Sequence, residues 1–187
     1  MFTASDHSFV VCAYKENPYI SGTIQSLMNQ TVRGNIILST STPSKYLEDV
    51  CSEFGIEMVV NPHPHLAGDD WNYGYNSVGT KLVTMAHQDD YYDPSFLERT
   101  IAALNKYDES ESLLSFTDYF ELRNDQRVYD NSLLKIKRIM NSPLSSAFLN
   151  NSVFLKKRIL SFGDSICCPA VTPVSYTHLT LPTNSRV

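Results

Sequence analysis

Short apolar runs alternate with helix-like segments along most of the chain, and this alternation limits the folds that the chain can adopt. The runs are of the buried-strand type and cover residues 8–14, 36–38, 56–60, 82–86 and 113–116. Between the first two runs, apolar residues recur at helical spacing at Ile20, Ile24 and Leu27. Because crossovers between parallel strands are right-handed, the pattern predicts an α/β fold: a doubly wound, mostly parallel sheet with helices on both faces.

Capping residues predict where the helices begin. Three helices are each expected to open with a cap residue and a proline, at Asn17-Pro18, Thr42-Pro43 and Asp93-Pro94. Asp69 or Asp70 is expected to cap a further short helix, which presents Trp71 on one side and Asn72 on another.

The pattern divides the chain into three predicted parts. Residues 1–122 form the α/β domain, and residues 123–173 form a carboxyl-terminal helical segment with helices at 133–140 and 144–160. We interpret this segment as a lid or an incomplete acceptor-side region. Residues 174–187 are expected to be a non-native tail, because the stretch VSYTHLTLPT is similar to the translation of a sequencing-library adapter. The alternative is a genuine threonine-rich tail.

Charge and hydropathy exclude several classes of function. A formal net charge of -5, with basic clusters only at KIKR and KKR, argues against a surface for polymeric nucleic acid. No apolar run approaches the roughly 18 residues of a membrane-spanning helix, and the first residues do not form a signal peptide. We therefore predict no transmembrane segment and a cytoplasmic location, with peripheral contact at the inner face of the membrane as an option. The four cysteines lack CxxC spacing, so they are interpreted as reduced packing residues.

Two adjacent carboxylates, Asp89 and Asp90, follow the strand predicted at residues 82–86. Open α/β sheets bind ligands at the carboxyl ends of their strands. Neighbouring carboxylates repel each other, and a divalent cation with oxygen ligands would offset their charge. The alternative is that the pair caps the next helix or forms a solvated turn.

Two ordered stretches resemble family 2 glycosyltransferases of the GT-A (Rossmann-like) fold, and the resemblance covers roughly Ser8 to Ala170. VVCAYKENPYISGTIQSLMNQT is similar to the family's opening strand, tyrosine-containing turn and first helix. GDDWNYGYNSVGTKLVTMAHQDDYYDPSFLE is similar to its Asn-x-Gly helix, core strand and acidic metal motif. The resemblance implies sugar transfer from a nucleotide-diphosphate sugar to a saccharide or lipid-linked acceptor, with inversion and with Mn²⁺ or Mg²⁺. Cell-surface polysaccharide synthesis is a further implication.

The resemblance also implies roles for single residues. Ala13, Tyr14 and Glu16 match the nucleotide-base pocket, whereas ordinary turn chemistry is the alternative. Asn72 matches an asparagine beside the donor, or is a polar helix-surface residue. Asp90, with Asp89, is expected to contact the metal and the ribose.

The chain departs from the family pattern at two strand ends. The stretch LSTSTP replaces an aspartate that many relatives carry after the second strand, so Thr40 and Ser41 offer only neutral hydrogen bonds and uridine specificity is open. His87 replaces the first aspartate of the acidic motif. It is a donor contact, a nitrogen ligand of the metal, or a strand-end histidine with satisfied hydrogen bonds. His63 and His65 are at a spacing that suits a metal, or belong to a surface loop.

The general base that an inverting transferase requires is expected beyond Pro173, so the chain is interpreted as truncated before it. Asp118 and Asp164 are the nearby carboxylates, but neither matches the family context. Two alternatives stay open. One is a catalytically inactive nucleotide-binding or interaction domain. The other is a nucleotidyltransferase, which should carry a glycine-rich or basic phosphate loop where this chain has only Lys15.

Overall fold

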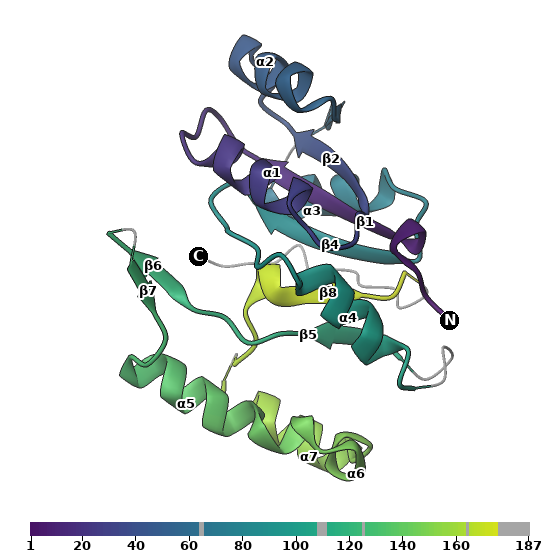
Figure 1. The fold of residues 1–187 in the computed structure, drawn as a ribbon, viewed down its shortest axis with the longest axis vertical. Coiled ribbons are helices and arrows are strands. Elements are labelled where there is room, and N and C mark those ends of the chain that lie inside the picture. Colours follow the sequence, from purple (N-terminus) through teal and green to yellow (C-terminus); the bar gives the residue numbers. More distant parts are fainter. Residues whose placement is uncertain (64–65, 108–111, 125, 164, 176–187) are drawn as a thin grey trace. The chain divides into compact units, whose positions relative to one another are not determined.

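The computed structural model describes residues 1–63, 66–107, 112–124, 126–163 and 165–175 (Figure 1). His65, Asp164 and all but the first two residues of the predicted tail lie outside the described residues. The chain divides into two compact units. The first comprises residues 1–115 and the segment that begins at Val171, and the second comprises residues 116–170. The predicted boundaries at residues 122 and 173 stay predictions.

The first unit is built on a four-stranded parallel sheet with the strand order β3-β2-β1-β4. Its strands are β1 (His7–Ala13), β2 (Asn35–Thr40), β3 (Glu57–Val60) and β4 (Leu82–His87). The chain runs outward from β1 to β3 and then returns to the other side of β1, so the switch in strand order falls between β1 and β4. At this switch Cys12 lies opposite His87, and on the other side of β1 Ala13 lies opposite Thr40.

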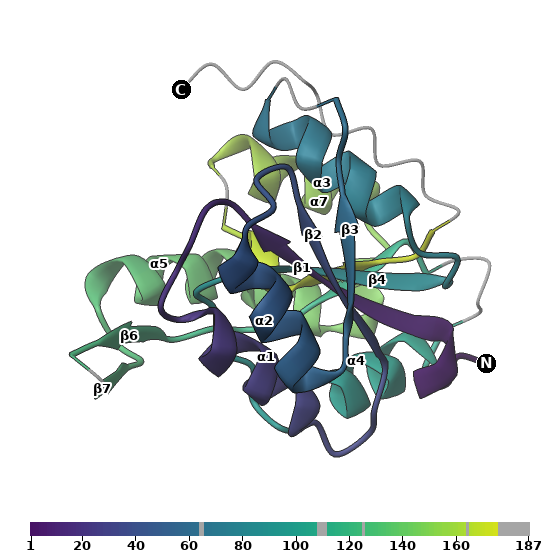
Figure 2. The ribbon, with the colours of Figure 1, turned by 90° about the horizontal axis from the view of Figure 1, so that it is seen from above.

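Helices cover both faces of the sheet, which confirms the predicted arrangement (Figure 2). The helices of this unit are α1 (Ile20–Met28), α2 (Lys45–Phe54), α3 (Ala67–Asn76) and α4 (Phe96–Leu104). Apolar residues of α1, α2 and α4 share one core cluster with the strands, and α3 packs on the opposite face through Tyr75. Alternate residues of β1 serve the two faces, with Phe9 and Val11 on one and Val10 on the other.

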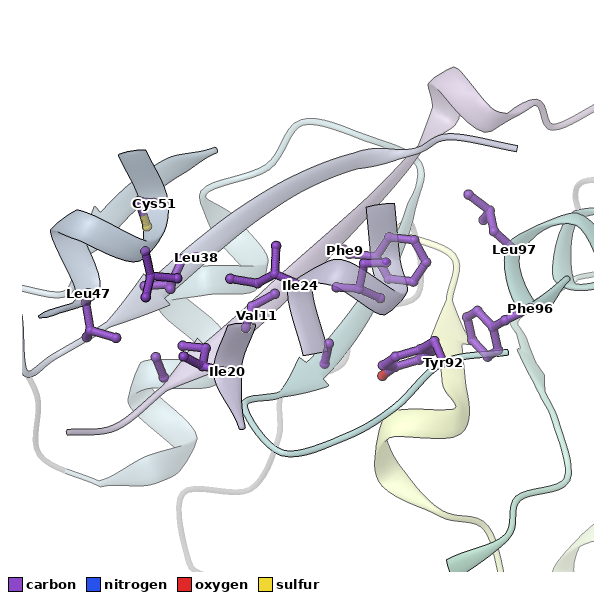
Figure 3. Close-up of a cluster of buried hydrophobic side chains, with 14 residues drawn as sticks. Phe9, Val11, Ile20, Ile24, Leu38, Leu47, Cys51, Tyr92, Phe96 and Leu97 are labelled. Atoms are coloured by element: carbon purple, nitrogen blue, oxygen red, sulfur yellow. The ribbon is translucent and has the colours of Figure 1, made fainter. Parts of the chain in front are cut away.

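The larger core cluster joins β1 to the segment that follows β4 (Figure 3). The ring of Phe9 lies 5.7 Å from that of Tyr92 and 6.1 Å from that of Phe96, measured between centroids. Ile20, Ile24 and Leu27 of α1 are all buried, as their helical spacing predicts. Leu82 at the start of β4 and Tyr92 after the acidic stretch are both buried, so this stretch is anchored on either side by apolar burial.

The helix starts differ from the sequence prediction. The helices α1, α2 and α4 each begin two residues after the predicted proline, and α3 is not N-capped by Asp69 or Asp70. Helix α3 begins at Ala67, and the carboxylate of Asp69 accepts a hydrogen bond from the backbone N–H of Leu66 at 3.0 Å. Asp69 thus satisfies the helix start from its third position, as in the side-chain half of a capping box. Asp70 takes no part in this cap and instead contacts Ser41 and Asn61, which follow β2 and β3.

A second strand pairing lies beside β4. The strands β5 (Leu114–Phe116) and β8 (Val171–Pro173) form a two-stranded sheet. The Thr172 hydroxyl lies 2.6 Å from that of Thr84 in β4, and Val174, which is fully buried, bridges Leu82 in antiparallel fashion. The sequence pattern predicts β5 but not β8.

The second unit contains a hairpin and several helices. Their bounds are β6 (Glu121–Arg123), β7 (Gln126–Val128), α5 (Ser132–Asn141), α6 (Ala147–Asn150) and α7 (Val153–Ser161). The single helix predicted for residues 144–160 is wrong: a 3-10 turn at Ser142–Ser145 precedes α6, and Ser152 caps α7 by accepting from the Leu155 N–H. Serine and asparagine side chains compete for backbone hydrogen bonds and so interrupt helices. Among the described residues, no helix is both long and apolar enough to cross a membrane.

Candidate functional site

A pocket of about 540 Å³ opens at the carboxyl ends of β1 and β2, beneath the first turns of α3. Its lining residues come from these three places and are Cys12, Ala13, Tyr14, Ser39, Ser41, Thr42, Leu66, Ala67, Asp70 and Trp71. Its size is typical of small-molecule sites. It borders the switch in strand order between β1 and β4, which is where doubly wound sheets bind their ligands.

Asp70 anchors α3 to the ends of two strands. Its Oδ2 accepts a hydrogen bond from the Ser41 hydroxyl at 2.5 Å, and its Oδ1 accepts one from the Asn61 side-chain amide at 2.8 Å. Ser41 directly follows β2 and Asn61 directly follows β3. Of the described residues that line the pocket, Asp70 alone carries a charged side chain.

Gly74 lets α3 come this close to the sheet. A Cβ atom added at this position would lie 2.8 Å from the Ser39 hydroxyl oxygen and 2.8 Å from Cγ1 of Val10, closer than such atoms can approach. Asp70 lies four residues earlier in the helix and therefore on the same face. Gly74 allows the close approach, and Asp70 then places its carboxylate at the carboxyl end of β2.

The turn after β1 is held by side chains from the segments that follow the two neighbouring strands, β4 and β2. The side-chain amide of Gln88 accepts from the N–H of Tyr14 and donates to its carbonyl, both at 3.1 Å, so it bridges the switch between β1 and β4. Lys15 adopts a left-handed backbone conformation with a φ of 59°, and its N–H donates to the Thr42 hydroxyl at 2.6 Å. The Tyr14 ring is left exposed at the pocket rim.

A stacked pair of rings connects the pocket to the acidic stretch. Trp71 lines the pocket and stacks on His87, with ring centroids 5.2 Å apart and an interplanar angle of 25°. Nδ1 of His87 lies 3.6 Å from Oδ2 of Asp90, and the same carboxylate oxygen accepts from the backbone N–H of His87 at 3.2 Å. His87 therefore lies between Asp90 and Trp71, which lines the pocket.

Burial raises the pKa of Asp90, the neighbouring His87 opposes that shift, and the charge of Asp89 adds to it. The ionised carboxylate is therefore under-compensated by the protein, as expected where a cation completes the site. The buried Nε2 of His87 likewise has no hydrogen-bond partner among the described residues. Within that part of the chain no group of three or more His, Cys, Asp or Glu side chains converges, so a cation here would need further ligands from a substrate or from water.

The predicted site residues separate into two groups. Ala13 and Tyr14 line the pocket, and His87 and Asp90 lie together behind Trp71. The side chains of Glu16 and Asp89 are exposed, and neither they nor Asn72 are among the residues lining the pocket. Their proposed roles stay predictions.

Sequence reasoning assigned no site role to Asp70, Trp71 or Gln88. A signal for Asp70 exists in hindsight, because it precedes Gly74 by one helical turn and so shares the face that approaches the sheet. Gln88 carried no such signal, since its partner Tyr14 is 74 residues away in the sequence.

The sequence profile of glycosyl transferase family 2 matches residues 8–169. This chain belongs to that family. An uncharacterized glycosyltransferase of Haemophilus influenzae is 26% identical over 117 residues, which are 59% of this chain and 36% of that protein. Family membership is thus established by the profile over most of the chain.

Solved structures of glycosyltransferases share the fold. Residues 1–349 of S. aureus TarS in complex with UDP-GlcNAc superpose with a TM-score of 0.53 at 17% identity, covering 68% of this chain and 37% of that one. The mannosyltransferase PcManGT from Pyrobaculum calidifontis, in complex with GDP-Man and Mn²⁺, gives a TM-score of 0.52 at 11% identity, covering 61% and 36%. The predicted GT-A architecture is confirmed. The chain spans little more than a third of the length of these relatives.

Proposed function

We propose that this family 2 glycosyltransferase chain binds a nucleotide-diphosphate sugar and serves its transfer to an acceptor hydroxyl. The observation that carries the proposal is the continuous arrangement of pocket, stacked rings and carboxylate at the strand switch: Trp71 lines the pocket, His87 stacks on it, and Asp90 pairs with His87. A nucleoside fits the pocket of about 540 Å³, and its diphosphate would extend toward Asp90.

Asp90, together with the exposed Asp89, would hold a divalent cation, Mn²⁺ or Mg²⁺, between the protein and the diphosphate. Such a cation stabilises the negative charge that develops on the departing diphosphate. The under-compensated carboxylate of Asp90 supports this assignment, as does the Mn²⁺ in the complex of the similar mannosyltransferase. His87 orients Asp90 by donating its backbone N–H to the carboxylate.

The turn after β1 would hold the base and ribose. Tyr14 offers an exposed ring at the pocket rim, and the Gln88 amide fixes the backbone on which that ring is carried. A fixed turn loses little conformational entropy when the ligand binds. Glu16 and Asn72 are proposed as outer contacts of the donor.

We propose inversion at the anomeric carbon, with a saccharide or lipid-linked hydroxyl as acceptor and surface polysaccharide as the product class. The base that deprotonates the acceptor is not assigned to a described residue. Asp118 is paired with Arg138, whose Nε donates to it at 2.7 Å, and this pairing suits a structural role.

We further propose a cytoplasmic protein that contacts an anionic membrane surface through its second unit. From Asn131 to Gly163 the sequence has six basic residues and no acidic one, although the whole chain has a net charge of -5. Large apolar side chains there are exposed, including Ile139 at 72%, Phe154 at 75% and Phe162 at 73%. Basic and apolar side chains together suit the headgroup region of an anionic bilayer.

Vesicle sedimentation tests this location. The chain should sediment with vesicles containing phosphatidylglycerol and not with phosphatidylcholine alone, and replacing Lys156 and Lys157 by glutamate should abolish sedimentation. Equal binding to both vesicle types, or none, would contradict the membrane proposal and leave the donor-site proposal intact.

Calorimetric titration of UDP, GDP and dTDP, with and without Mn²⁺, tests the donor site. Wild type should bind at least one of them only with Mn²⁺, and Asp90→Asn should lose that binding because the amide keeps the size but not the charge. Glu57→Gln is the matched control, since it removes an exposed carboxylate from the amino end of β3, where the strand starts. A folded wild type that binds no nucleotide, or an Asp90→Asn variant that binds normally, would refute the proposal.

A further inference from the structure

The carboxylate of Asp70 is held at the pocket by two hydrogen bonds and has further acceptor sites that these bonds do not use. A carboxylate has about four acceptor sites. The Ser41 hydroxyl and the Asn61 amide each use one, on different oxygens, and together they fix the plane of the group. Asp70 lines the pocket and is only partly buried, so the unused acceptor sites are available to a ligand.

The surroundings of Asp70 favour a neutral ring over a phosphate. Its negative charge repels phosphate oxygens, and no basic side chain lines the pocket among the described residues. The other polar lining groups are the hydroxyls of Ser39, Ser41 and Thr42, and the rings of Tyr14 and Trp71 stand at the same pocket. This end of the site therefore suits a flat heterocycle that donates hydrogen bonds.

The position of Asp70 is imposed by packing and is not a chance rotamer. Asp69 is engaged at the helix start by the Leu66 N–H, so the two adjacent carboxylates have separate tasks. Gly74 holds the helix against Ser39 and Val10, one turn after Asp70. A carboxylate fixed in this way can discriminate between ligands, because it cannot turn away from a mismatched partner.

We propose that Asp70 selects the base of the donor by accepting a hydrogen bond from a ring N–H at the base-pairing edge. Uracil, thymine and guanine carry such a ring N–H. Cytosine and adenine carry a lone pair on the corresponding ring nitrogen, which would face the carboxylate without a proton between them. The inference rests on the proposed nucleotide-diphosphate function and assigns its base class.

The experiment compares Mn²⁺-supported binding of UDP, dTDP, GDP, CDP and ADP by wild type and by Asp70→Asn. Wild type should bind the best of the first three about 10- to 100-fold more tightly than CDP or ADP, as expected for one hydrogen bond to a charged group. In Asp70→Asn the gap should shrink to within a few-fold, because an amide can donate to the ring nitrogen of cytosine.

The substitution is chosen to preserve the fold. The side-chain oxygen of an asparagine at this position can still accept from the Asn61 amide. Its NH₂ group can donate to the Ser41 hydroxyl, so that Ser41 becomes an acceptor instead of a donor. Asp69→Asn is the matched control: it changes the adjacent carboxylate, keeps the acceptor for the Leu66 N–H, and should leave the base ranking unchanged. Equal unfolding midpoints of the three proteins would establish that the comparison concerns binding alone.

Four outcomes would overturn the inference. If Asp70→Asn keeps the wild-type ranking, Asp70 does not read the base. If it weakens all five nucleotides equally, Asp70 contacts the ribose or merely supports the pocket. If wild type binds no nucleotide with Mn²⁺, the proposed function fails as well, whereas Mn²⁺-dependent binding without base selection overturns the assignment of Asp70 alone.

Discussion

The close packing of α3 on the sheet at Gly74 predicts that Gly74→Ala damages both stability and binding. The added Cβ would lie 2.8 Å from the Ser39 hydroxyl oxygen and from Cγ1 of Val10, whereas ordinary contacts begin at about 3.4 Å. The helix must therefore shift outward by roughly half an ångström or more. Overpacking of this kind costs about 1–3 kcal/mol, and the better helix propensity of alanine offsets about 0.5–1 kcal/mol of it. We expect a net destabilisation of about 1 kcal/mol, and at most about 2.5 kcal/mol.

The same shift should weaken nucleotide binding, because Asp70 moves with the helix. Its Oδ2 is 2.5 Å from the Ser41 hydroxyl oxygen, and an outward movement loosens this contact and displaces the carboxylate from the pocket. We expect about a tenfold rise in the nucleotide dissociation constant, which corresponds to about 1.4 kcal/mol.

Urea unfolding and nucleotide titration of Gly74→Ala and Gly68→Ala measure these effects. Gly68 lies in the same helix, and a Cβ added there meets nothing within 4 Å, so Gly68→Ala should be as stable as wild type or slightly more stable. The reasoning would be refuted if Gly74→Ala matched wild type in stability, or if both alanine variants lost the same stability.

Three further predictions concern single residues. Burial lowers the pKa of His7 to about 3, so between pH 6.5 and 3 the unfolded chain binds more protons than the folded one and stability falls as the pH falls. Urea unfolding should show a loss of about 2 kcal/mol from pH 7 to pH 5, and this dependence should be absent in His7→Gln. Burial raises the pKa of Asp90, so keeping its ionised carboxylate in the folded protein costs free energy, and Asp90→Asn should unfold at a higher temperature than wild type; a lower midpoint would contradict the assigned burial cost. Trp71 is the only tryptophan of the chain, so a nucleotide in the pocket should change its fluorescence, and saturating Mn²⁺ and nucleotide without any spectral change would place the ligand elsewhere.

The parallel sheet and its flanking helices could be predicted because their signals are local. The spacing of Ile20, Ile24 and Leu27 defines the buried face of α1, and Gly55 ends α2 in the left-handed conformation that its sequence position predicts. The acidic stretch could also be placed at the end of β4, because a buried apolar strand followed by polar residues has one plausible boundary.

The missed features depend on partners that are distant in the sequence. Nothing local distinguishes Asp69, whose carboxylate accepts from the Leu66 N–H at the start of α3, from Asp70, whose hydroxyl partner Ser41 is 29 residues away. β8 is short and contains a proline, so its pairing with β5 carries no periodic signal. The pocket is likewise a product of tertiary packing, since it forms only when α3 approaches β1 and β2.

The central claim is that the base occupies the pocket beside Tyr14 and Asp70 while a divalent cation sits at Asp90. A crystal structure of the chain with UDP and Mn²⁺, with the cation located by its anomalous scattering, tests this most directly. We expect an anomalous peak within about 2.5 Å of an Asp90 carboxylate oxygen, in contact with the diphosphate, and the uracil N–H directed at Asp70. A cation that avoids Asp90, or a nucleotide whose base lies outside the pocket at the carboxyl ends of β1 and β2, would contradict it.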